Sequence, residues 1–362
     1  MDRKYWFWIN NIPRIGNIKI RKILKAFGDD PEAAAHAGDK ELGCIGGLMQ
    51  ADIAAIMDLN LRKRLFEEYD RRTEDGNKMV FPFEDEYPSR LKEIYDRPNV
   101  IYYKGRLPVD DIKSVAVVGS RNCSEYGRSV AMELGRVLAS AGAQVISGLA
   151  LGIDVAAHQG AVLAGGLTFA VLAGGVDLCY PKQNFNTYVD IIRNGGIISE
   201  FPDNTPTRPG MFPLRNRIIS GLCDAVIIVE AGIKSGSLIT AAQALEQNRQ
   251  VYAVPGRISD GDSEGCNHLI WQGAQIVYSY DELLAELNLN ISEGTKINEK
   301  NILLASDEKM LYSQLLDFGP KSLETLIKET NMSQMQVFQA LLALELKGLI
   351  KEISKNFYIR II

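Results

Sequence analysis

The chain has 362 residues, of which 46% are hydrophobic and 23% are charged, and its formal net charge is -5. This length exceeds one typical domain, and no apolar run is long enough to span a bilayer, so we expect a soluble protein of two or three domains. The net charge excludes a uniformly basic nucleic-acid binder, although a local basic patch can still attract phosphate. The start lacks the features of a signal peptide, and the five cysteines show no disulfide or zinc spacing. We therefore expect a cytoplasmic protein without a metal or other cofactor.

Residues 1–75 are predicted to form an N-terminal helical domain, because apolar residues recur at helical spacing between glycine-containing turns. Two of these turns, IPRIG and CIGG, precede helices and suggest a helix-hairpin-helix or SAM-like domain, in which backbone N–H groups can meet a DNA phosphate. A basic run that suits such contact comprises Arg14, Lys19, Arg21, Lys22 and Lys25. A small helical bundle with a solvated charged face explains the same pattern equally well.

Residues 76–288 are predicted to form an extended Rossmann-like α/β domain with a parallel sheet core. A proline-containing connector comes first. From residue 114 onward, strand-like runs alternate with helix-like stretches, which is typical of βαβ units covered on both faces of the sheet. The runs are SVAVV, QVIS, TFAVL, GIIS, AVIIV, QVYAV and QIVY.

Residues 289–305 read as a polar linker, and residues 306–362 resemble a winged helix with three helices and a strand pair. Ser322 and Ser333 stand where helix N-caps belong, and a turn is expected near Lys355 and Asn356. The presumed recognition helix after Ser333 has no arginine or lysine before Lys347. We therefore favour protein contact or a weak DNA role for this domain over direct reading of the major groove. A regulatory DNA binder that works through this domain remains an alternative.

Several turns between Gly119 and Thr240 follow predicted strands and open predicted helices. Because the carboxyl ends of parallel strands share one edge of a sheet, these turns are expected to converge on one crevice. The first two turns offer glycines for close backbone approach, hydroxyls, and a guanidinium suited to phosphate. Their candidate residues are Gly119, Ser120, Arg121, Ser147, Gly148, Leu149 and Gly152.

The later turns add cations and helix N-termini that suit phosphate. Their candidate residues are Lys182, Asn184, Arg215, Asn216, Arg217, Gly236 and Ser237. Tyr180 could stack on a base, but a buried tyrosine is as consistent with the sequence. One of the two arginines can instead form a structural ion pair. The ordered arrangement of these turns predicts several phosphates bound in a row.

The sequence lacks the motifs of several enzyme classes. There is no GxGxxG motif and no acid at the end of the second strand, which argues against a nicotinamide dinucleotide. Asp154 and His158 could pair, but no nucleophile accompanies them. The remaining alternative is a nucleotide-processing enzyme of the lysine-decarboxylase-like or phosphoribohydrolase type on a similar Rossmann core. Its PGGxGTxxE turn is replaced here by IKSGSLITAAQALE, so Glu230 or Glu246 would have to serve as the catalytic acid.

The segments GSR, SGLALGIDVAAHQGAV, YPKQN, ISEFP, FPLRNRIISGL, VEAGIKSGSLITAAQALEQNRQVYAVPG and GCNHLIWQGA occur in this order. Over about residues 80–287 the chain resembles the DNA-processing protein A (DprA/Smf) family. The resemblance implies a homodimer that binds single-stranded DNA without sequence preference. It also implies that the protein protects incoming DNA and loads the RecA recombinase during natural transformation. Carried over by motif, Arg121, Lys182 and Arg215 would be the main phosphate contacts, with backbone donors from the glycine-rich turns. Because the predicted crevice offers no obvious nucleophile, metal cluster or paired carboxylates, we also expect that the protein is not an enzyme.

Overall fold

The computed structural model describes residues 2–289, 304–315, 321–347, 349–354 and 356–360. The chain forms two compact units, Met1–Ile291 and Ser292–Ile362, each of which is described by itself. Most of the predicted linker lies outside the described residues. The predicted boundary near residue 75 falls inside the first unit and stays a prediction. In the described part of the chain, no helix combines the length and apolar character needed to cross a membrane.

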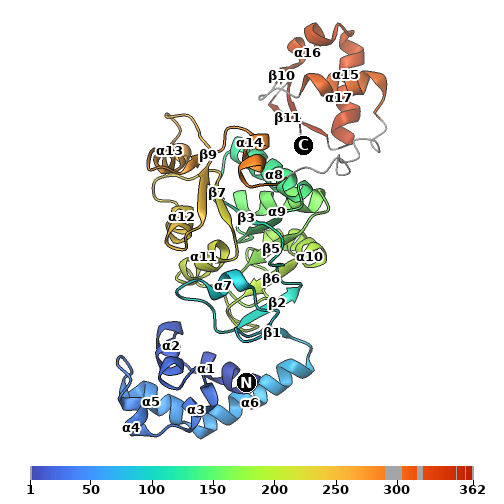
Figure 1. The fold of residues 1–362 in the computed structure, drawn as a ribbon. Helices are drawn as coiled ribbons and strands as arrows, with labels where there is room; N and C mark the ends of the chain where they lie inside the picture. The colour runs from blue at the N-terminus through green and yellow to red at the C-terminus, as the bar shows by residue number, and fades with distance from the viewer. Residues whose placement is uncertain (1, 290–303, 316–320, 348, 355, 361–362) are drawn as a thin grey trace. The chain divides into compact units, whose positions relative to one another are not determined.

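The first unit begins with a bundle of short helices (Figure 1). They are α1 (Arg3–Asn10), α2 (Asn17–Ala26), α3 (Pro31–His36), α4 (Asp39–Gly43), α5 (Gln50–Met57) and α6 (Leu59–Glu74). Asp30 and Asp58 cap α3 and α6 by accepting hydrogen bonds from backbone N–H groups of the first turn. The interior is apolar and aromatic, with Phe7 and Trp8 fully buried on α1. This confirms the predicted N-terminal helical region.

A nine-stranded sheet follows, in the order β1-β2-β6-β5-β4-β3-β7-β8-β9. Its strands are β1 (Lys78–Val80), β2 (Ile101–Gly105), β3 (Ser114–Val118), β4 (Gln144–Ser147), β5 (Thr168–Val171), β6 (Gly196–Ser199), β7 (Ala225–Ile228), β8 (Gln250–Ala253) and β9 (Gln275–Ile276). The seven predicted strands are β3 to β9, and their neighbours pair in parallel. Two further strands were not predicted: β1 lies just before the predicted connector and β2 lies within it, and β2 pairs antiparallel with β6. The sheet is therefore mostly, not wholly, parallel.

Helices cover both faces of the sheet (Figure 1). One face carries α8 (Glu125–Ser140), α9 (Ile153–Leu163), α10 (Phe185–Asn194) and α14 (Tyr280–Glu286), and the other carries α7 (Ser89–Lys92), α11 (Met211–Gly221), α12 (Ser237–Glu246) and α13 (Glu264–Trp271). Two short 3-10 helices are η1 (Lys182–Asn184) and η2 (Gly261–Ser263). Successive residues of β3 alternate between the two faces, since Val115 and Val117 pack with α8 and α9 while Ala116 and Val118 face α11 and α12. Burial on both faces explains the continuous apolar runs in the sequence.

The second unit is a winged helix. Its elements are α15 (Ser306–Gln314), β10 (Lys321–Ser322), α16 (Leu323–Thr330), α17 (Gln334–Leu346), β11 (Ile350–Ser354) and β12 (Phe357–Arg360). Ser322 and Ser333 cap α16 and α17, as predicted, and β10 adds a short strand that was not predicted. Lys355, in the predicted turn, lies outside the described residues. The side chain of Lys347 donates a hydrogen bond to Glu308, so the first cation after α17 contributes to the fold of this unit.

Candidate nucleic-acid interface

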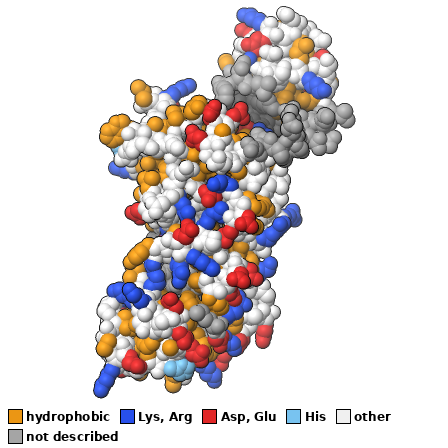
Figure 2. Space-filling model, viewed as in Figure 1, with side chains coloured by type: hydrophobic (Ala, Val, Ile, Leu, Met, Phe, Trp, Pro, Cys, Tyr) orange, Lys and Arg blue, Asp and Glu red, His pale blue; other side chains and the backbone are white. Residues whose placement is uncertain are grey.

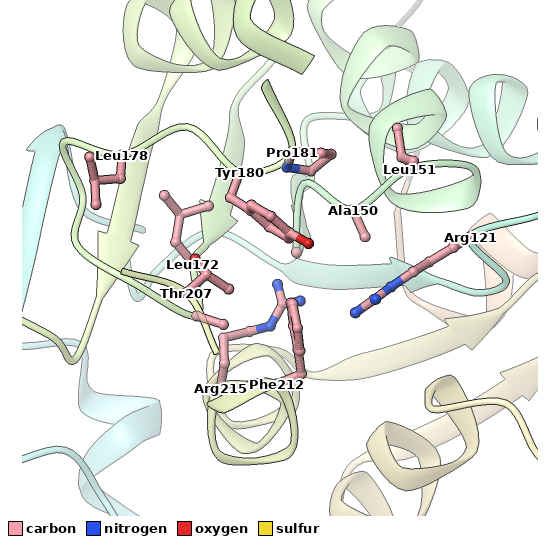
Figure 3. Close-up of a pocket in the computed structure, with 12 residues that line it drawn as sticks. Arg121, Ala150, Leu151, Leu172, Leu178, Tyr180, Pro181, Thr207, Phe212 and Arg215 are labelled. Carbon is pink, nitrogen blue, oxygen red and sulfur yellow. The ribbon is translucent and has the colours of Figure 1, made fainter. Parts of the chain in front are cut away.

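A small hollow of about 70 Å³ lies where β3, β4 and β5 end and α11 begins (Figure 3). Its lining residues are Arg121, Gly148, Ala150, Leu151, Leu172, Ala173, Leu178, Tyr180, Pro181, Thr207, Phe212 and Arg215. Clefts that enclose small-molecule ligands typically have volumes of roughly 300–1,000 Å³. The hollow is therefore better suited to part of an extended ligand than to an enclosed nucleotide.

Arg215 is the buried cation of this hollow. It lies on α11 with 4% of its surface exposed, and its Nη1 donates a hydrogen bond to the carbonyl oxygen of Val171 at the end of β5 (2.6 Å). Burial lowers the pKa of Arg215 to about 10, an effect that nearby Asp154 opposes, so the guanidinium is charged at neutral pH. Its Nε is buried without a hydrogen-bond partner among the described residues. A buried cation with an unused donor favours the approach of an anion.

Arg121 is the exposed cation of the hollow, and an aromatic ring holds its side chain in place. Its guanidinium lies over the ring of Phe212, 4.3 Å from the centroid. The ring of Tyr180 lies 6.2 Å from that of Phe212 and is tilted against it. The sequence allowed either a buried Tyr180 or one that stacks on a base. Tyr180 is 52% exposed, so the structure supports the second alternative. Figure 3 shows Arg121, Tyr180, Phe212 and Arg215 converging from three segments of the chain.

Lys182 is exposed at the start of η1, next to Pro181 of the hollow. Asn184 fixes the loop that carries Lys182. Its buried amide donates hydrogen bonds to the carbonyl oxygens of Leu149 (2.9 Å) and Ala150 (3.2 Å). Asn184 thus joins two of the predicted turns, while Lys182 keeps its ammonium in solvent. The lysine is available to a phosphate, and the amide of Asn184 is already bonded within the protein.

The glycine-rich turn between β4 and α9 uses its donors inside the protein. Gly148 N and Ala150 N both donate to Oδ2 of Asp154, at 3.1 and 3.4 Å. Burial raises the pKa of Asp154, although Arg215 and these N–H groups counteract the rise. A carboxylate of the chain thus occupies the predicted anion site. Gly148 has a further reason to lack a side chain, since a Cβ there would overlap the guanidinium of Arg215.

The other residues of that turn have structural partners as well. Ser147 is fully buried and donates its hydroxyl to the carbonyl oxygen of Val117 (2.7 Å). Leu149 is buried and has a φ of 55°, and Gly152 has a φ of 78°, so the chain turns sharply through left-handed conformations. These residues shape the floor of the hollow, and a direct role for them in DNA binding stays a prediction.

His158 does not form a catalytic pair with Asp154. Its Nδ1 lies 2.7 Å from the hydroxyl of Thr168, and the ring is fully buried. Burial lowers the pKa of His158 to about 3, so the imidazole is neutral in the folded protein at ordinary pH. We assign His158 to the interior of the fold.

Because His158 is buried and neutral, we expect the stability of the first unit to depend on pH. Because its pKa is about 6.5 when unfolded and about 3 when folded, the unfolded chain binds the extra proton, and stability falls as pH drops below 6.5. We expect the wild-type chain to lose about 1 kcal/mol through this residue between pH 6.5 and 5.5. The variant His158→Gln should lose that much less over the same interval, whereas His36→Gln, which changes an exposed histidine, should match the wild type.

Urea unfolding followed by tryptophan fluorescence measures this effect in the first unit, which contains all three tryptophans, Trp6, Trp8 and Trp271. Equal pH dependence in the wild type and His158→Gln would show that the buried imidazole does not control acid stability.

Arg217 points away from the hollow. It is 4% exposed, its Nε lies 3.0 Å from Asp96, and its Nη2 donates to Glu200 (2.5 Å). Two carboxylates already neutralise its charge, which corresponds to the structural ion pair foreseen for one of the two arginines. We therefore do not propose Arg217 as a phosphate contact. Its neighbour Asn216 is half-buried, and its amide reaches the carbonyl oxygen of Gly236 (3.5 Å).

The start of α12 lies beside α11 through that contact. Gly236 is exposed, with open space where a Cβ would stand, whereas Ser237 is buried and shares a hydrogen bond with the hydroxyl of Ser235 (2.8 Å). The first N–H groups of α12 are already bonded within the protein: Ser237 N donates to Ser235 Oγ (3.4 Å), Leu238 N to Ser235 O (3.2 Å) and Ile239 N to Gly236 O (3.2 Å). A direct role of Gly236 and Ser237 in DNA binding stays a prediction.

The sheet reverses its strand order between β3 and β7, where a dinucleotide would bind in a Rossmann fold. Here Glu230, which is 5% exposed, occupies the start of α8: its Oε2 accepts from Ser124 N and its Oε1 from the Ser124 hydroxyl, both at 2.7 Å. A Cβ at Gly119 would meet Glu230 O, and one at Gly127 would overlap its carboxylate. A carboxylate in this place excludes a pyrophosphate by repulsion.

The same placement weighs against the enzyme alternative. Glu230 is bonded to Ser124, the N-cap residue of α8, and Glu246 is the last residue of α12, about 13 Å along the helix axis from Ser237. Neither glutamate is placed to act as an acid in the hollow.

Of the predicted residues, Arg121, Gly148 and Arg215 line one hollow. Ser120 adjoins it and is half-buried; its hydroxyl accepts from Asn122 N (3.2 Å). Sequence reasoning did not assign Phe212, which orients Arg121. The signal was present in the aromatic-proline pair that precedes the arginines of α11.

Two family models match this chain. That of DNA recombination-mediator protein A matches residues 78–288, and that of the DprA winged helix domain matches residues 301–354. Among curated proteins, the chain is 45% identical over 203 residues to DNA processing protein DprA of Streptococcus pneumoniae, covering 56% of this chain and 72% of that protein. It is 34% identical over 290 residues to Protein Smf of Synechocystis, covering 79% of this chain and 73% of that protein.

Solved structures agree with these matches. The X-ray structure of DprA from Streptococcus pneumoniae superimposes with a TM-score of 0.64 at 35% identity, covering 79% of this chain and 98% of that one. A DprA structure from Helicobacter pylori, whose description concerns its single-stranded DNA binding mode, superimposes with a TM-score of 0.54 at 29% identity. That match covers 59% of this chain and 97% of the other.

Proposed function

This chain belongs to the DNA recombination-mediator protein A (DprA/Smf) family, and on that premise we propose that it binds single-stranded DNA through the hollow at the strand ends. Binding is independent of base sequence, because the available groups are cations and aromatic faces rather than donors and acceptors aimed at base edges. Arg121 and Lys182 contact phosphates from the exposed side, and Arg215 attracts the backbone from the floor. At the start of α12, the exposed Gly236 allows a further phosphate to approach, whereas Ser237 is buried and already bonded to Ser235.

The observation that carries this proposal is the pairing of Arg121 with Phe212 beside the exposed ring of Tyr180. Proteins that bind single strands without sequence preference combine a positive groove with aromatic stacking platforms. The small volume of the hollow agrees with a strand that passes across it. The DprA structure from Helicobacter pylori, with its described single-stranded DNA binding mode, supports the same ligand.

We further propose that the bound strand is protected and handed to the RecA recombinase, that the protein acts as a homodimer in the cytoplasm, and that it is not an enzyme. This part of the proposal rests on family membership, since the family is one of recombination mediators. The placement of Glu230 and His158 in the interior of the fold, with partners of their own, is consistent with a role in binding rather than catalysis.

Fluorescence anisotropy of a labelled poly-dT strand, compared with a matched duplex across a salt series, tests the proposal. We expect tight binding that prefers the single strand and weakens steeply with salt, because phosphate contacts release counterions. Equal affinity for the duplex would indicate that the helical regions, and not the hollow, bind the DNA. Binding of a mononucleotide with turnover, and not of poly-dT, would favour a nucleotide-processing enzyme.

Removal of the winged helix should leave this binding in place. The exposed face of α17 carries Met335, Phe338, Leu342 and Leu346, which are apolar, and no arginine or lysine. We therefore expect a chain truncated after residue 305 to bind poly-dT within about twofold of the full chain, as measured by anisotropy. Abolished binding would instead identify the winged helix as the site of DNA contact.

A further inference from the structure

A second basic hollow lies in the first unit, between α2 and the segment formed by α7 and the loop after it. It has a volume of about 420 Å³, and its described lining includes four cations, Arg21, Lys25, Lys92 and Arg97, but a single acid, Asp29. Figure 2 shows Lys and Arg side chains gathered where α2 borders α7. We call this feature, defined by its four cations, the basic groove.

The cations of α2 divide into two groups with different tasks. Lys19 forms an ion pair with Asp52 (2.7 Å), and Lys22 donates to the carbonyl oxygen of Gly46 (2.9 Å), so these two hold the helical region together. The pKa of Asp52 is lowered by its hydrogen bond with Lys19. Arg21 and Lys25 face the basic groove instead. The basic run in the sequence is therefore only partly a structural feature.

Arg21 is prearranged for a ligand. Its guanidinium lies over the ring of Tyr95, 4.5 Å from the centroid, and its Nη2 is buried without a hydrogen-bond partner among the described residues. Tyr95 is 82% exposed, so its ring is largely free. An exposed aromatic ring beside a guanidinium is the combination on which bases stack in single-strand binders.

Both walls of the basic groove are fixed to the protein core. On the α2 side, Asn17 donates to Glu200 (2.5 Å) and accepts from Asn99 (3.1 Å). On the other side, Asp96, the neighbour of Arg97, pairs with Arg217 of α11. The fold therefore holds the four cations close together. Their mutual repulsion is unfavourable, and a bound anion would relieve it.

Within the described residues, Lys25, Lys92 and Arg97 have no carboxylate within ion-pair distance.

Arg215 and Arg217, which are two residues apart and so point to different sides of α11, connect the hollow with the wall of the basic groove. The hollow and the basic groove are thus linked through α11, Arg217 and Asp96, and a strand has to extend past α11 to contact both.

We propose that the basic groove binds backbone phosphates of the same DNA strand outside the hollow, with Tyr95 as a stacking platform. This inference rests on the proposed single-strand binding and extends it to a second contact that only longer strands reach. An acidic protein segment is the competing occupant, but it would make no use of the exposed ring beside Arg21.

The test compares Lys25→Ala/Lys92→Ala with a control, Lys40→Ala/Lys63→Ala, which removes the same charge from exposed positions of the helical region. Anisotropy is measured with poly-dT strands of about 6 and about 30 nucleotides over a salt series. For the longer strand, we expect the groove variant to bind about tenfold more weakly than the control at about 0.1 M salt, with a salt slope lower by about 1.4. For the shorter strand, the two variants should bind alike.

Equal binding of the longer strand by the groove variant and the control would overturn the inference, and an acidic protein would then be the better occupant. Equal weakening for both strand lengths would overturn it as well, because the basic groove would not be an extension of another site. The double variant Arg121→Ala/Lys182→Ala separates this result from the proposed function. If that variant binds both strands like the wild type while the groove variant loses the longer one, the hollow is wrongly assigned and the basic groove stands.

Discussion

Replacing Arg121 and Lys182 together by alanine is expected to weaken binding of poly-dT by about tenfold or more at about 0.1 M salt. Each side chain supplies one phosphate contact, and each lost contact lowers the salt slope by about 0.7 for a single strand. Arg121 is exposed over Phe212, and Lys182 is exposed on a loop that Asn184 fixes, so neither change removes a buried group. The fold should survive, and the loss should appear at every strand length.

The matched control is Lys40→Ala/Lys63→Ala, which lowers the net charge by the same amount far along the chain from the hollow. It should bind like the wild type. If the control and the hollow variant weaken binding equally, the effect comes from net charge, and the assignment of Arg121 and Lys182 fails.

Replacing Arg217 by alanine is expected to destabilise the first unit by about 3–5 kcal/mol. The change leaves Glu200, which is 9% exposed, as a buried carboxylate without its cation, and it removes the pair with Asp96. Urea unfolding followed by tryptophan fluorescence measures the loss. Where the variant is still folded, its affinity for a short poly-dT strand should match the wild type, because Arg217 does not line the hollow.

Arg193→Ala provides the comparison for this result. Arg193 also pairs with an aspartate, Asp190, but its side chain is 73% exposed, and such surface pairs contribute about 0–1 kcal/mol. A loss of DNA affinity in folded Arg217→Ala, with little change in stability, would return Arg217 to the set of DNA ligands predicted from the sequence.

The sequence predicts the sheet well where strands are buried on both faces. The runs that became β3 to β9 are apolar and separated by helical stretches, so their type and order follow from the pattern. It does not predict β1, which is only three residues long, or β2, which lies in a connector that contains several prolines. Their place in the sheet depends on the pairing of β2 with β6, more than ninety positions further along the chain.

The sequence predicts that several turns share one edge of the sheet, but it does not predict how their groups are used. Strand ends must share an edge, which is why Arg121, Gly148 and Arg215 line one hollow. Whether an N–H group is free depends on contacts that spacing does not reveal. Asp154 reaches back to Gly148, and Arg217 finds Asp96 from a distant segment. The same limit explains why Phe212 was not assigned as the support of Arg121.

Photo-crosslinking of a poly-dT strand that carries 5-bromouracil tests most directly whether the strand lies across the hollow. The halogenated base links to an aromatic side chain on which it stacks, and mass spectrometry of the digested adduct identifies the residue. We expect adducts at Tyr180 or Phe212, both of which line the hollow. Adducts confined to the winged helix, for example at the exposed Phe338 of α17, would contradict the account and place the single strand on the second unit.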